Sequence, residues 1–461
     1  MFPADVYKNR RNQLRKEVSG GIALIPGNQE AAMNYPANTY AFRQDSNFSY
    51  FFGLHHPDLA GIIDLESGPD ILFGNDVDID DIIWMGKQPL MKDQAALAGV
   101  KEVKPFTQLA PFIAEALKKG RKIHFVPPYR GETYIQLHHL LNLPVAEVKK
   151  NASAELIKGI VNLRMVKEEA EVVEIEKMVD VAFEMHTTAM KMAKPGVVER
   201  EIAGIMEGIA LSKGRGVSFP IILSINGQTL HNHYHGNILK TGRMMVSDAG
   251  AESELLYASD ITRTVPVGGK FDARQKLIYG IVLDTNMKAI AASKPGVPFK
   301  DVHLLAAMTI TDGLKAAGFM KGDTKEAVLK GAHSLFFPHG LGHPLGMDVH
   351  DLEGLGENFV GYDEEVQRSK EFGLAFLRFG RKLREGFVMT IEPGIYFIPE
   401  LIDLWKAEKK HEAFINYDMV EKFRDFGGIR IEDDILITPG GCRVLGKPIP
   451  KTIDEIETMM R

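Results

Sequence analysis

The chain has 461 residues, of which 45% are hydrophobic and 25% are charged, and its formal net charge is -6. This length and composition can bury more than one core, and we expect two domains. The acidic balance argues against nucleic-acid binding, no stretch is apolar enough to cross a membrane, and the charged N-terminus is unlike a signal peptide. Cys442 is the single cysteine, which excludes an intrachain disulfide and favours the cytoplasm.

The first third of the chain alternates helical patterns with short apolar runs. The helical patterns cover residues 6–18, 111–119 and 134–141, and the apolar runs cover residues 21–26, 59–65 and 123–126. Such alternation predicts an α/β domain. A polar stretch then leads into a charged amphipathic segment, residues 167–192, that predicts a long helix. We therefore place the boundary between the two domains at residue 160.

A short motif occurs twice in the second domain. Lys194-Pro195-Gly196-Val197 and Lys294-Pro295-Gly296-Val297 each follow a long helical segment, at an offset of 100 residues. Pro and Gly end helices in any protein, so a chance recurrence stays open as an alternative. The repeated order of helix, turn, helix and strands nevertheless indicates two similar halves that enclose one site.

Four carboxylates and one histidine lie in distinctive strings of the second domain: Asp248, Asp260, His343, Glu392 and Glu432. The β-prone residues around Asp248 and Asp260 predict two neighbouring strands. Because the two positions are separated by an even number, both carboxylates would lie on one side of an extended chain, although a turn near Gly250 weakens this argument. His343 lies in a glycine-rich string that is typical of a tight loop. Glu392 and Glu432 lie on short apolar segments that also predict strands.

These five side chains can hold two hard divalent cations, whose four positive charges the four carboxylates would balance. Oxygen-rich ligation is compatible with Mn, Fe, Co or Zn, and the imidazole argues against a pure Mg or Ca site. A metal pair lowers the pKa of bound water to about 7 in favourable sites and offers a charge sink, both of which amide hydrolysis needs. The sequence therefore predicts a metallohydrolase.

All five strings resemble those of the pita-bread metallopeptidases, the family of methionine aminopeptidase, aminopeptidase P and Xaa-Pro dipeptidase (prolidase). Phe-Arg-Gln-Asp-Ser-Asn-Phe-Ser-Tyr-Phe-Phe-Gly from Phe42 and Ile-Trp-Met-Gly-Lys from Ile83 resemble the N-terminal domain of the aminopeptidase P and prolidase branch. The resemblance implies an α+β chain. Residues 1–160 would form an α/β creatinase/aminopeptidase P-like domain, and residues 161–461 a pita-bread catalytic domain with a pseudo-twofold antiparallel sheet covered by helices.

The resemblance also implies a role for each ligand. Asp248 would chelate one ion and His343 and Glu392 the other, while Asp260 and Glu432 would bridge the two. Glu392 would in addition shuttle the proton of the attacking water. Manganese is the expected metal, mainly because this branch of the family often uses it.

Three further histidines are catalytic candidates. His231 matches the family's substrate-contacting histidine upstream of the first metal Asp, His350 matches the one after the glycine-rich loop, and His339 is the third. Each could donate a hydrogen bond to the scissile carbonyl or its oxyanion. His231 also alternates with His233 and His235, so on a strand the three would share a face and could form a separate metal site. The alternative, which we favour, is that His233 and His235 are surface groups or lie in the layer of residues around the metal ligands.

Three residues are candidates for substrate binding. Arg430 precedes Glu432 by two positions, so on a strand both would face the cavity, where the guanidinium could pair with a carboxylate. Arg378 resembles the prolidase arginine that binds the C-terminal carboxylate of a dipeptide, and a surface arginine is the alternative. Trp84 resembles an aromatic of the N-terminal domain that reaches a neighbouring subunit's site, and a buried core tryptophan is the alternative.

We therefore expect a cytoplasmic, homodimeric, dinuclear metallopeptidase that acts on small proline-containing peptides and cleaves Xaa-Pro bonds in dipeptides. Proline's imide nitrogen carries no hydrogen, so such bonds need a dedicated site. One alternative is an aminopeptidase P that acts on longer peptides, and Arg378 would discriminate between the two. The other is a metal-free binding protein on the same fold, although such relatives lose ligand residues and this chain keeps all five.

Overall fold

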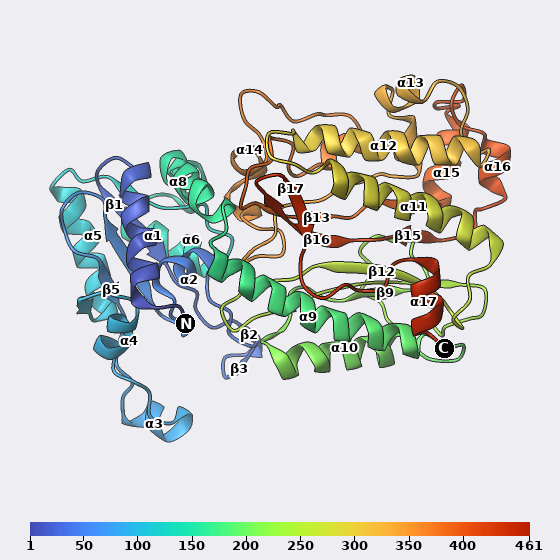
Figure 1. Cartoon of the computed structure of the whole chain (residues 1–461). Coiled ribbons are helices and arrows are strands. Elements are labelled where there is room, and N and C mark those ends of the chain that lie inside the picture. The colour runs from blue at the N-terminus through green and yellow to red at the C-terminus, as the bar shows by residue number, and fades with distance from the viewer. The chain divides into compact units, whose positions relative to one another are not determined.

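The computed structural model of the chain describes residues 1–461, which divide into two compact units (Figure 1). Unit 1 comprises Met1–Arg164 and Leu352–Val360, and unit 2 comprises Met165–Asp351 and Gly361–Arg461. None of the helices combines the length and the apolar character that crossing a lipid bilayer requires.

Unit 1 is built on a mixed five-stranded sheet with the strand order β6-β5-β4-β1-β7. The central pairs β1–β4 and β4–β5 are antiparallel, whereas the outer pairs β5–β6 and β1–β7 are parallel. Every residue of β1, β4 and β5 is buried, which explains why these strands are apolar runs rather than alternating patterns. The five strands are β1 (Ile22–Pro26), β4 (Ala60–Asp64), β5 (Ile71–Phe73), β6 (Glu102–Lys104) and β7 (Ile123–His124).

The helices of unit 1 include the three that the sequence patterns predict, namely α1, α5 and α6. Apolar residues of α5 and α6, such as Ile113 and Leu137, pack with Leu24, Ile62 and Phe73 of the sheet in one core. The helices are α1 (Ala4–Glu17), α2 (Ser46–Phe52), α3 (Ile79–Met85), α4 (Met91–Leu97), α5 (Leu109–Lys118), α6 (Gly131–Leu141), α7 (Val145–Val148), α8 (Ala154–Met165) and α14 (Glu357–Val360).

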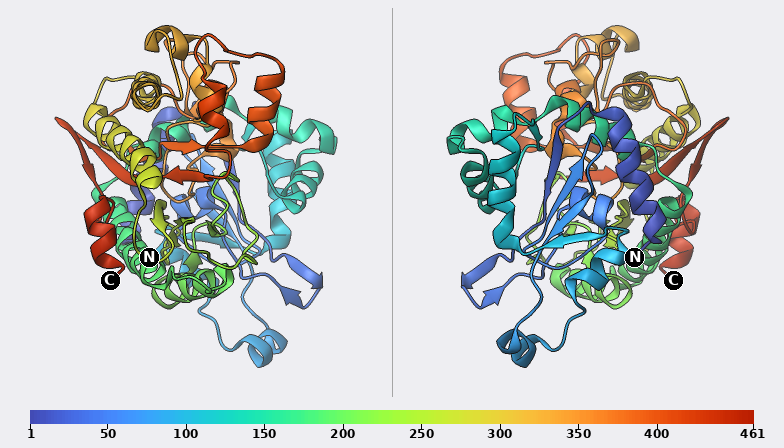
Figure 2. Two further views of the ribbon diagram at one scale, coloured as in Figure 1. Left: turned by 90° about the vertical axis from the view of Figure 1, so that its right-hand side faces the viewer. Right: turned by 90° about the vertical axis from the view of Figure 1, so that its left-hand side faces the viewer.

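Two segments project from the body of unit 1 (Figure 2). One is the hairpin of β2 (Ala32–Tyr35) and β3 (Asn38–Thr39), and the other is helix α3. Asp78 caps α3 in a reciprocal capping box with Asp81, so the local sequence stabilises this short helix although none of its residues is buried.

Unit 2 contains two halves with the same order of elements. In each half two helices pack on each other and a group of antiparallel strands follows, and Figure 1 shows the strands lying between the two helix pairs. The first half has α9 (Glu169–Met192), α10 (Glu199–Lys213), β8 (Gly216–Val217), β9 (Ile222–Ser224), β10 (Met244–Ala249), β11 (Ala251–Glu252) and β12 (Ile261–Pro266). The second half has α11 (Ala273–Ala292), α12 (Phe299–Ala316), β13 (Val388–Ile391), β14 (Gly394–Tyr396), β15 (Gly428–Arg430), β16 (Asp433–Thr438) and β17 (Gly441–Val444).

Strand pairing is antiparallel throughout unit 2, in the orders β12-β10-β9, β11-β8, β13-β16-β17 and β14-β15. Helix α9 packs against β10–β12, and α11 packs against β13–β15 and β17. The remaining helices are α13 (Thr324–Leu329), α15 (Pro399–Ala407), α16 (Tyr417–Glu421) and α17 (Ile453–Met459).

The repeated Lys-Pro-Gly-Val motif makes the same turn in both halves. Gly196 and Gly296 have φ of 90° and 83°, a left-handed conformation that favours glycine. Gly196 donates its N–H to the carbonyl of Leu239 (2.9 Å), and Gly296 donates its N–H to the carbonyl of Leu383 (2.8 Å). Both motifs therefore close a helical hairpin and tie it to a later segment of the same half, as the prediction of two similar halves requires.

Candidate metal centre

Asp248 and Asp260 come from two neighbouring strands, as the sequence predicts. Strand β10 carries Asp248 and pairs antiparallel with β12, so that Asp248 lies opposite Thr262. Asp260 lies directly before β12, and its N–H donates to Asp434 Oδ2 (3.0 Å). The connection between the strands is tight at Gly250, where a Cβ atom would lie 1.7 Å from the carbonyl oxygen of Ser259. Only glycine fits at this position.

His343 lies in the irregular segment that follows the short 3-10 helix Ala332–Leu335. The segment is held against β13, because the His343 N–H donates to Thr390 Oγ1 (3.1 Å) and the Thr390 N–H donates to the His343 carbonyl (2.9 Å). The His343 Nδ1 lies 3.0 Å from the Pro344 carbonyl, so Nδ1 carries the ring proton. The other ring nitrogen, Nε2, is then free of hydrogen and faces the carboxylates.

Glu392 and Glu432 lie just beyond strand ends rather than within strands, which corrects the prediction for both. Glu392 follows β13 directly, and the next residue, Pro393, has no N–H with which to continue the ladder. Glu432 lies between β15 and β16, and its N–H donates to the carbonyl of Thr262 in the other half of the unit (3.1 Å). Both segments leave their ladders where the glutamate turns toward the site.

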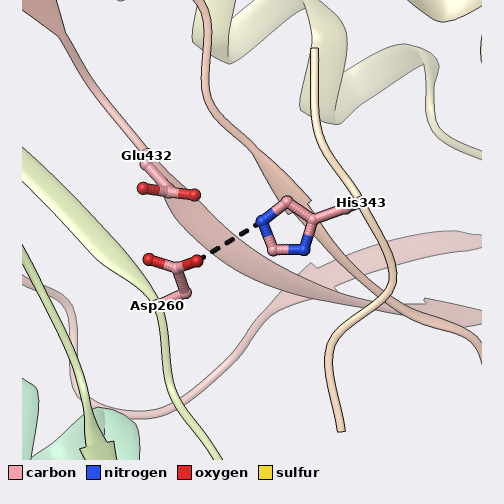
Figure 3. A group of neighbouring side chains, drawn as sticks. All are labelled: Asp260, His343 and Glu432. Atoms are coloured by element: carbon pink, nitrogen blue, oxygen red, sulfur yellow. Dashed lines mark ion pairs between the residues drawn. The ribbon is translucent and has the colours of Figure 1, made fainter. Parts of the chain in front are cut away.

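All five predicted ligands line one cavity of about 620 Å³ in unit 2. His343 Nε2 lies 3.4 Å from Asp260 Oδ2 and 3.7 Å from Glu392 Oε1. One ligand atom each of Asp260, His343 and Glu432 lies within 4.8 Å of the other two. Figure 3 shows the imidazole of His343 directed at the carboxylate of Asp260, with the carboxylate of Glu432 beside them.

The electrostatics of this cavity fit divalent cations. Burial and the neighbouring charge of Glu432 raise the pKa of Asp260 well above its usual range, and burial and Glu392 do the same for Glu432. Burial raises the pKa of Glu392 to about 8. Asp248 Oδ1 is buried without a hydrogen-bond partner. Buried carboxylates this close together need a compensating positive charge, which a metal pair would provide.

Burial also keeps the site's imidazoles neutral. Burial and the neighbouring His350 hold the pKa of His343 well below its usual range, so the ring is in the form that binds a metal. Burial and Arg430 lower the pKa of His339 to about 3. Desolvation in the cavity wall, with Arg430 as the next cause, lowers the pKa of His231.

Arg430 is one of two arginines in the cavity wall. Its Nη2 donates to Asp248 Oδ2 (2.6 Å), its Nε to Thr262 Oγ1 (3.1 Å), and its Nη1 to Tyr396 Oη (2.9 Å). The sequence predicts that Arg430 and Glu432 face the same cavity, and both line it. Its ion-pair partner, however, is Asp248 from the first half of the unit.

The predicted catalytic histidines His231, His339 and His350 all line this cavity. His339 Nε2 lies 2.9 Å from Tyr396 Oη, which links it to Arg430. His233 lines the cavity too, but residues 231–235 form no strand, so the separate three-histidine site on one strand face is wrong. His235 instead places Nδ1 3.1 Å from the carbonyl of Leu223.

The two other substrate-binding candidates lie in different units. Arg378 lines the cavity and is partly buried, so it is not a surface arginine. Trp84 lies on α3 in unit 1 and is 85% exposed, which rules out the alternative of a buried core tryptophan.

Sequence patterns did not identify Thr262 and Tyr396, which bond to residues of the cavity wall, or Phe372 and Phe376, which line the cavity. Thr262 donates to Glu432 Oε2 (2.6 Å), and Tyr396 bonds both Arg430 and His339. Thr262 lies two positions after Asp260, so strand parity was a signal for it. Phe372 and Phe376 form an edge-to-face pair in the cavity wall, and no pattern in their irregular segment marks them.

Comparison with known families decides which kind of protein this architecture belongs to. A family model described as metallopeptidase family M24 matches residues 173–439, and a model described as the aminopeptidase P N-terminal domain matches residues 7–124. The chain belongs to metallopeptidase family M24. This membership confirms the resemblance that the ligand strings predict, and it marks the chain as a metallopeptidase.

Individual M24 relatives are similar over almost the whole chain. An Xaa-Pro dipeptidase of Homo sapiens is 32% identical over 96% of this chain and 89% of the relative. A probable Xaa-Pro aminopeptidase of Fusarium vanettenii is 37% identical over 100% of this chain and 97% of the relative. The solved structure of Pseudomonas aeruginosa aminopeptidase PepP has a TM-score of 0.82 and 26% identity, covering 100% of this chain and 98% of that one. The predicted two-domain α+β architecture is thereby confirmed.

Proposed function

We propose that this M24 protein is a dinuclear metallopeptidase that hydrolyses Xaa-Pro bonds, with dipeptides as its main substrates. The observation that carries the proposal is that Arg378 and the five ligand candidates line one cavity. The cavity thus combines carboxylates that suit divalent metal ions with an arginine, Arg378, that suits the carboxylate of a substrate. The Xaa-Pro dipeptidase of Homo sapiens supports the proline specificity.

The metal ligands of this proposal are Asp248, Asp260, His343, Glu392 and Glu432. Asp248 would hold one ion, His343 and Glu392 the other, and Asp260 and Glu432 both. The short separations among Asp260, His343 and Glu432 support this assignment. When bound, the two ions supply an activated water and a charge sink for the oxyanion, and Mn²⁺ is the metal that we propose.

The remaining steps fall to the side chains of the cavity. Glu392, which lines the cavity beside His343, would take a proton from the attacking water and return it. The leaving nitrogen of proline needs that proton, because it departs as a secondary amine. His231 and His350 would donate hydrogen bonds to the scissile carbonyl as charge develops on its oxygen. The neutral ring of His339 donates its one N–H, at Nδ1, to the Gly340 carbonyl (2.7 Å) and would instead orient Tyr396 through Nε2.

Arg378 would bind the C-terminal carboxylate of a dipeptide, and Arg430 would orient Asp248. A planar guanidinium suits a carboxylate because it can donate two parallel hydrogen bonds. A longer peptide carries a neutral amide at the same place and would lose this charged interaction. This difference is the physical reason for the preference for dipeptides.

The second candidate function is an Xaa-Pro aminopeptidase that acts on longer peptides. The 37% identical relative of Fusarium vanettenii bears that name, and the similar solved structures include Escherichia coli aminopeptidase P with the inhibitor Pro-Leu. Substrate length separates the two functions, because an aminopeptidase of this kind requires no free carboxylate after proline.

The deciding experiment compares kcat/KM for Ala-Pro, Ala-Pro-amide and Ala-Pro-Ala on the full chain loaded with Mn²⁺. We expect Ala-Pro to be the best substrate, and Arg378→Gln to lower its kcat/KM by roughly 10- to 100-fold, the worth of a hydrogen bond to a charged group. The amide should respond little to that substitution. Lys382→Gln, which removes a positive charge at a half-exposed side chain nearby, is the matched control. Faster turnover of Ala-Pro-Ala would favour the aminopeptidase.

Three wider features complete the proposal. Residues 1–160 form the aminopeptidase P-like domain and residues 161–461 the catalytic domain. The protein is a cytoplasmic homodimer, and its content of one cysteine supports a reducing compartment. Trp84 contributes to a neighbouring subunit's site, which its 85% exposure supports.

A further inference from the structure

Asn286 occupies an unusual position for an amide in the middle of a helix. It lies on α11 and is fully buried, and this helix packs against β13 and β15, the strands that precede Glu392 and Glu432. A buried carboxamide must satisfy both its donors and its acceptor, so its partners define its role.

The two donors of this amide reach both glutamate segments at once. Asn286 Nδ2 donates to the carbonyl of Ile391 (3.1 Å) and to the carbonyl of Ile431 (3.4 Å). Ile391 directly precedes Glu392, and Ile431 directly precedes Glu432. One rigid group therefore joins the backbones of two ligand candidates that lie 40 positions apart in the sequence.

The acceptor fixes which way the carboxamide points. Asn286 Oδ1 accepts a hydrogen bond from Lys451 Nζ (2.9 Å), and the same ammonium donates to Asp433 Oδ2 (2.6 Å). Tyr279, also on α11, donates its hydroxyl to the Lys451 carbonyl (2.7 Å). With Lys451 held from both sides, the amide cannot flip without losing all three bonds.

The hydrogen bonds of Asn286 hold together two segments whose side chains can repel each other. Glu392 and Glu432 place two carboxyl groups in one poorly solvated cavity, where the two would repel strongly if both were ionised. Arg263 Nη1 also donates to the Glu432 carbonyl (2.6 Å), but none of the Arg263 hydrogen bonds reaches the Glu392 segment. The strands around the two segments pair as β13–β16 and β14–β15, and Asn286 joins the segments in the gap between these two ladders, where Glu392 and Glu432 lie.

We propose that Asn286 is a positioning residue that fixes the spacing of the Glu392 and Glu432 backbones and thereby sets the affinity of the site for divalent cations. The inference rests on the proposed metal site. Outer partners that orient ligands without touching the metal typically change metal affinity by about 10- to 100-fold when they are removed.

The test uses the full chain, stripped of metal by a chelator and titrated with Mn²⁺ by calorimetry, with the visible absorption of bound Co²⁺ as a spectroscopic readout. Asn286→Leu removes all three bonds. Asn286→Asp differs by one atom, keeps the acceptor for Lys451 and loses both donors. Thr285→Val is the matched control, because Thr285 is equally buried on the same helix and bonds only to the Ile281 carbonyl of that helix (2.7 Å).

We expect both Asn286 variants to bind Mn²⁺ about 10-fold or more weakly and to change the Co²⁺ spectrum, while Thr285→Val matches the wild type. If Asn286→Leu does not fold, the isosteric Asn286→Asp carries the test. Wild-type affinity and spectrum in Asn286→Asp, or an equal loss in Thr285→Val, would overturn the inference. Failure of the wild type itself to bind Mn²⁺ or to cleave Ala-Pro would instead sink the proposed function.

Discussion

Arg430 Nη2 lies 2.6 Å from Asp248 Oδ2, and both side chains are buried in the wall of the cavity. The two residues come from different halves of the catalytic unit, on β15 and β10. The pair thus places one permanent positive charge beside the carboxylates that are candidate metal ligands. Arg430 also lowers the pKa of Glu392 against the larger effect of burial.

The first prediction concerns this cation. Arg430→Met should raise the pKa of Glu392 further, because the positive charge that favours the ionised carboxylate is gone. The acid limb of the pH profile of kcat/KM should therefore move to higher pH by roughly one unit. Arg430→Lys keeps the positive charge but loses the planar guanidinium, so it should lower kcat and shift the acid limb less than Arg430→Met does. An unshifted acid limb in Arg430→Met would show that Arg430 does not act on these carboxylates.

The second prediction concerns the stability of the metal-free protein. Burial raises the pKa of folded Glu392 to about 8 from an ordinary value of 4.5, so the folded state holds a proton that the unfolded state releases. The stability that Glu392 contributes to the folded protein should therefore be fully present below about pH 4.5 and should be lost as the pH rises toward 8. Bound Mn²⁺ should remove this loss, since cations favour the ionised carboxylates.

Melting temperatures at pH 5.5, 7.0 and 8.5, with chelator and with Mn²⁺, measure this effect. Glu392→Gln should make the slope of the metal-free protein less steep, because the amide does not titrate, while Asp260 and Glu432 still contribute. A metal-free protein whose melting temperature rises from pH 5.5 to 8.5 would contradict the assigned direction of the shift.

The sequence predicted much of this site because its signals are local. Asp248 and Asp260 lie in β-prone strings, and the turn of the Lys-Pro-Gly-Val motif depends on Gly196 and Gly296 alone. Local signals place a residue on an element and, by parity, on one face of it. They therefore predicted the two neighbouring strands beside Asp248 and Asp260 and the two similar halves, whereas the full set of ligand candidates followed from the family resemblance of the five strings.

The rest of the site depends on contacts between distant segments. The partner of Arg430 is Asp248, which lies 182 positions away, and no local pattern identifies such a pair. The alternation of His231, His233 and His235 looks like a strand, yet these residues find no partner strand and form an irregular segment. The amide of Asn286 is equally invisible, because its helix gives no sign that it faces two glutamate segments.

The third prediction concerns a buried ion pair at the end of the loop that carries His343. Lys167 Nζ lies 2.8 Å from Asp351 Oδ2, and both side chains are almost completely buried. Lys167→Met removes the buried cation that faces Asp351, and it should lower the free energy of unfolding by about 3–5 kcal/mol. The double variant Lys167→Met with Asp351→Asn should recover part of this loss.

Urea unfolding measures these changes. Lys177→Met on the following helix, α9, is the control, because its ammonium is largely exposed and the substitution should change stability by less than about 0.5 kcal/mol. Equal stability losses in Lys167→Met and Lys177→Met would show that the buried pair has no special weight.

The last prediction concerns the exposed helix α3. Trp84 is 85% exposed, and Ile79, Ile83 and Met85 on the same short helix are 68–71% exposed, so the helix presents an apolar cluster to solvent. Clusters of this kind on folded proteins mark interaction surfaces, and exposed tryptophans are frequent hot spots. If α3 contacts a second copy of the chain, Trp84→Ser should weaken the dimer by about 2 kcal/mol or more, roughly 30-fold in Kd.

Leu211→Ser on α10 is the matched control, because Leu211 is similarly exposed at 67% and lies on a polar-faced helix. Sedimentation velocity across a concentration series gives the Kd of each variant, and circular dichroism confirms that each is folded. An unchanged Kd for Trp84→Ser would remove α3 from the dimer interface, since the substitution deletes its most exposed apolar side chain.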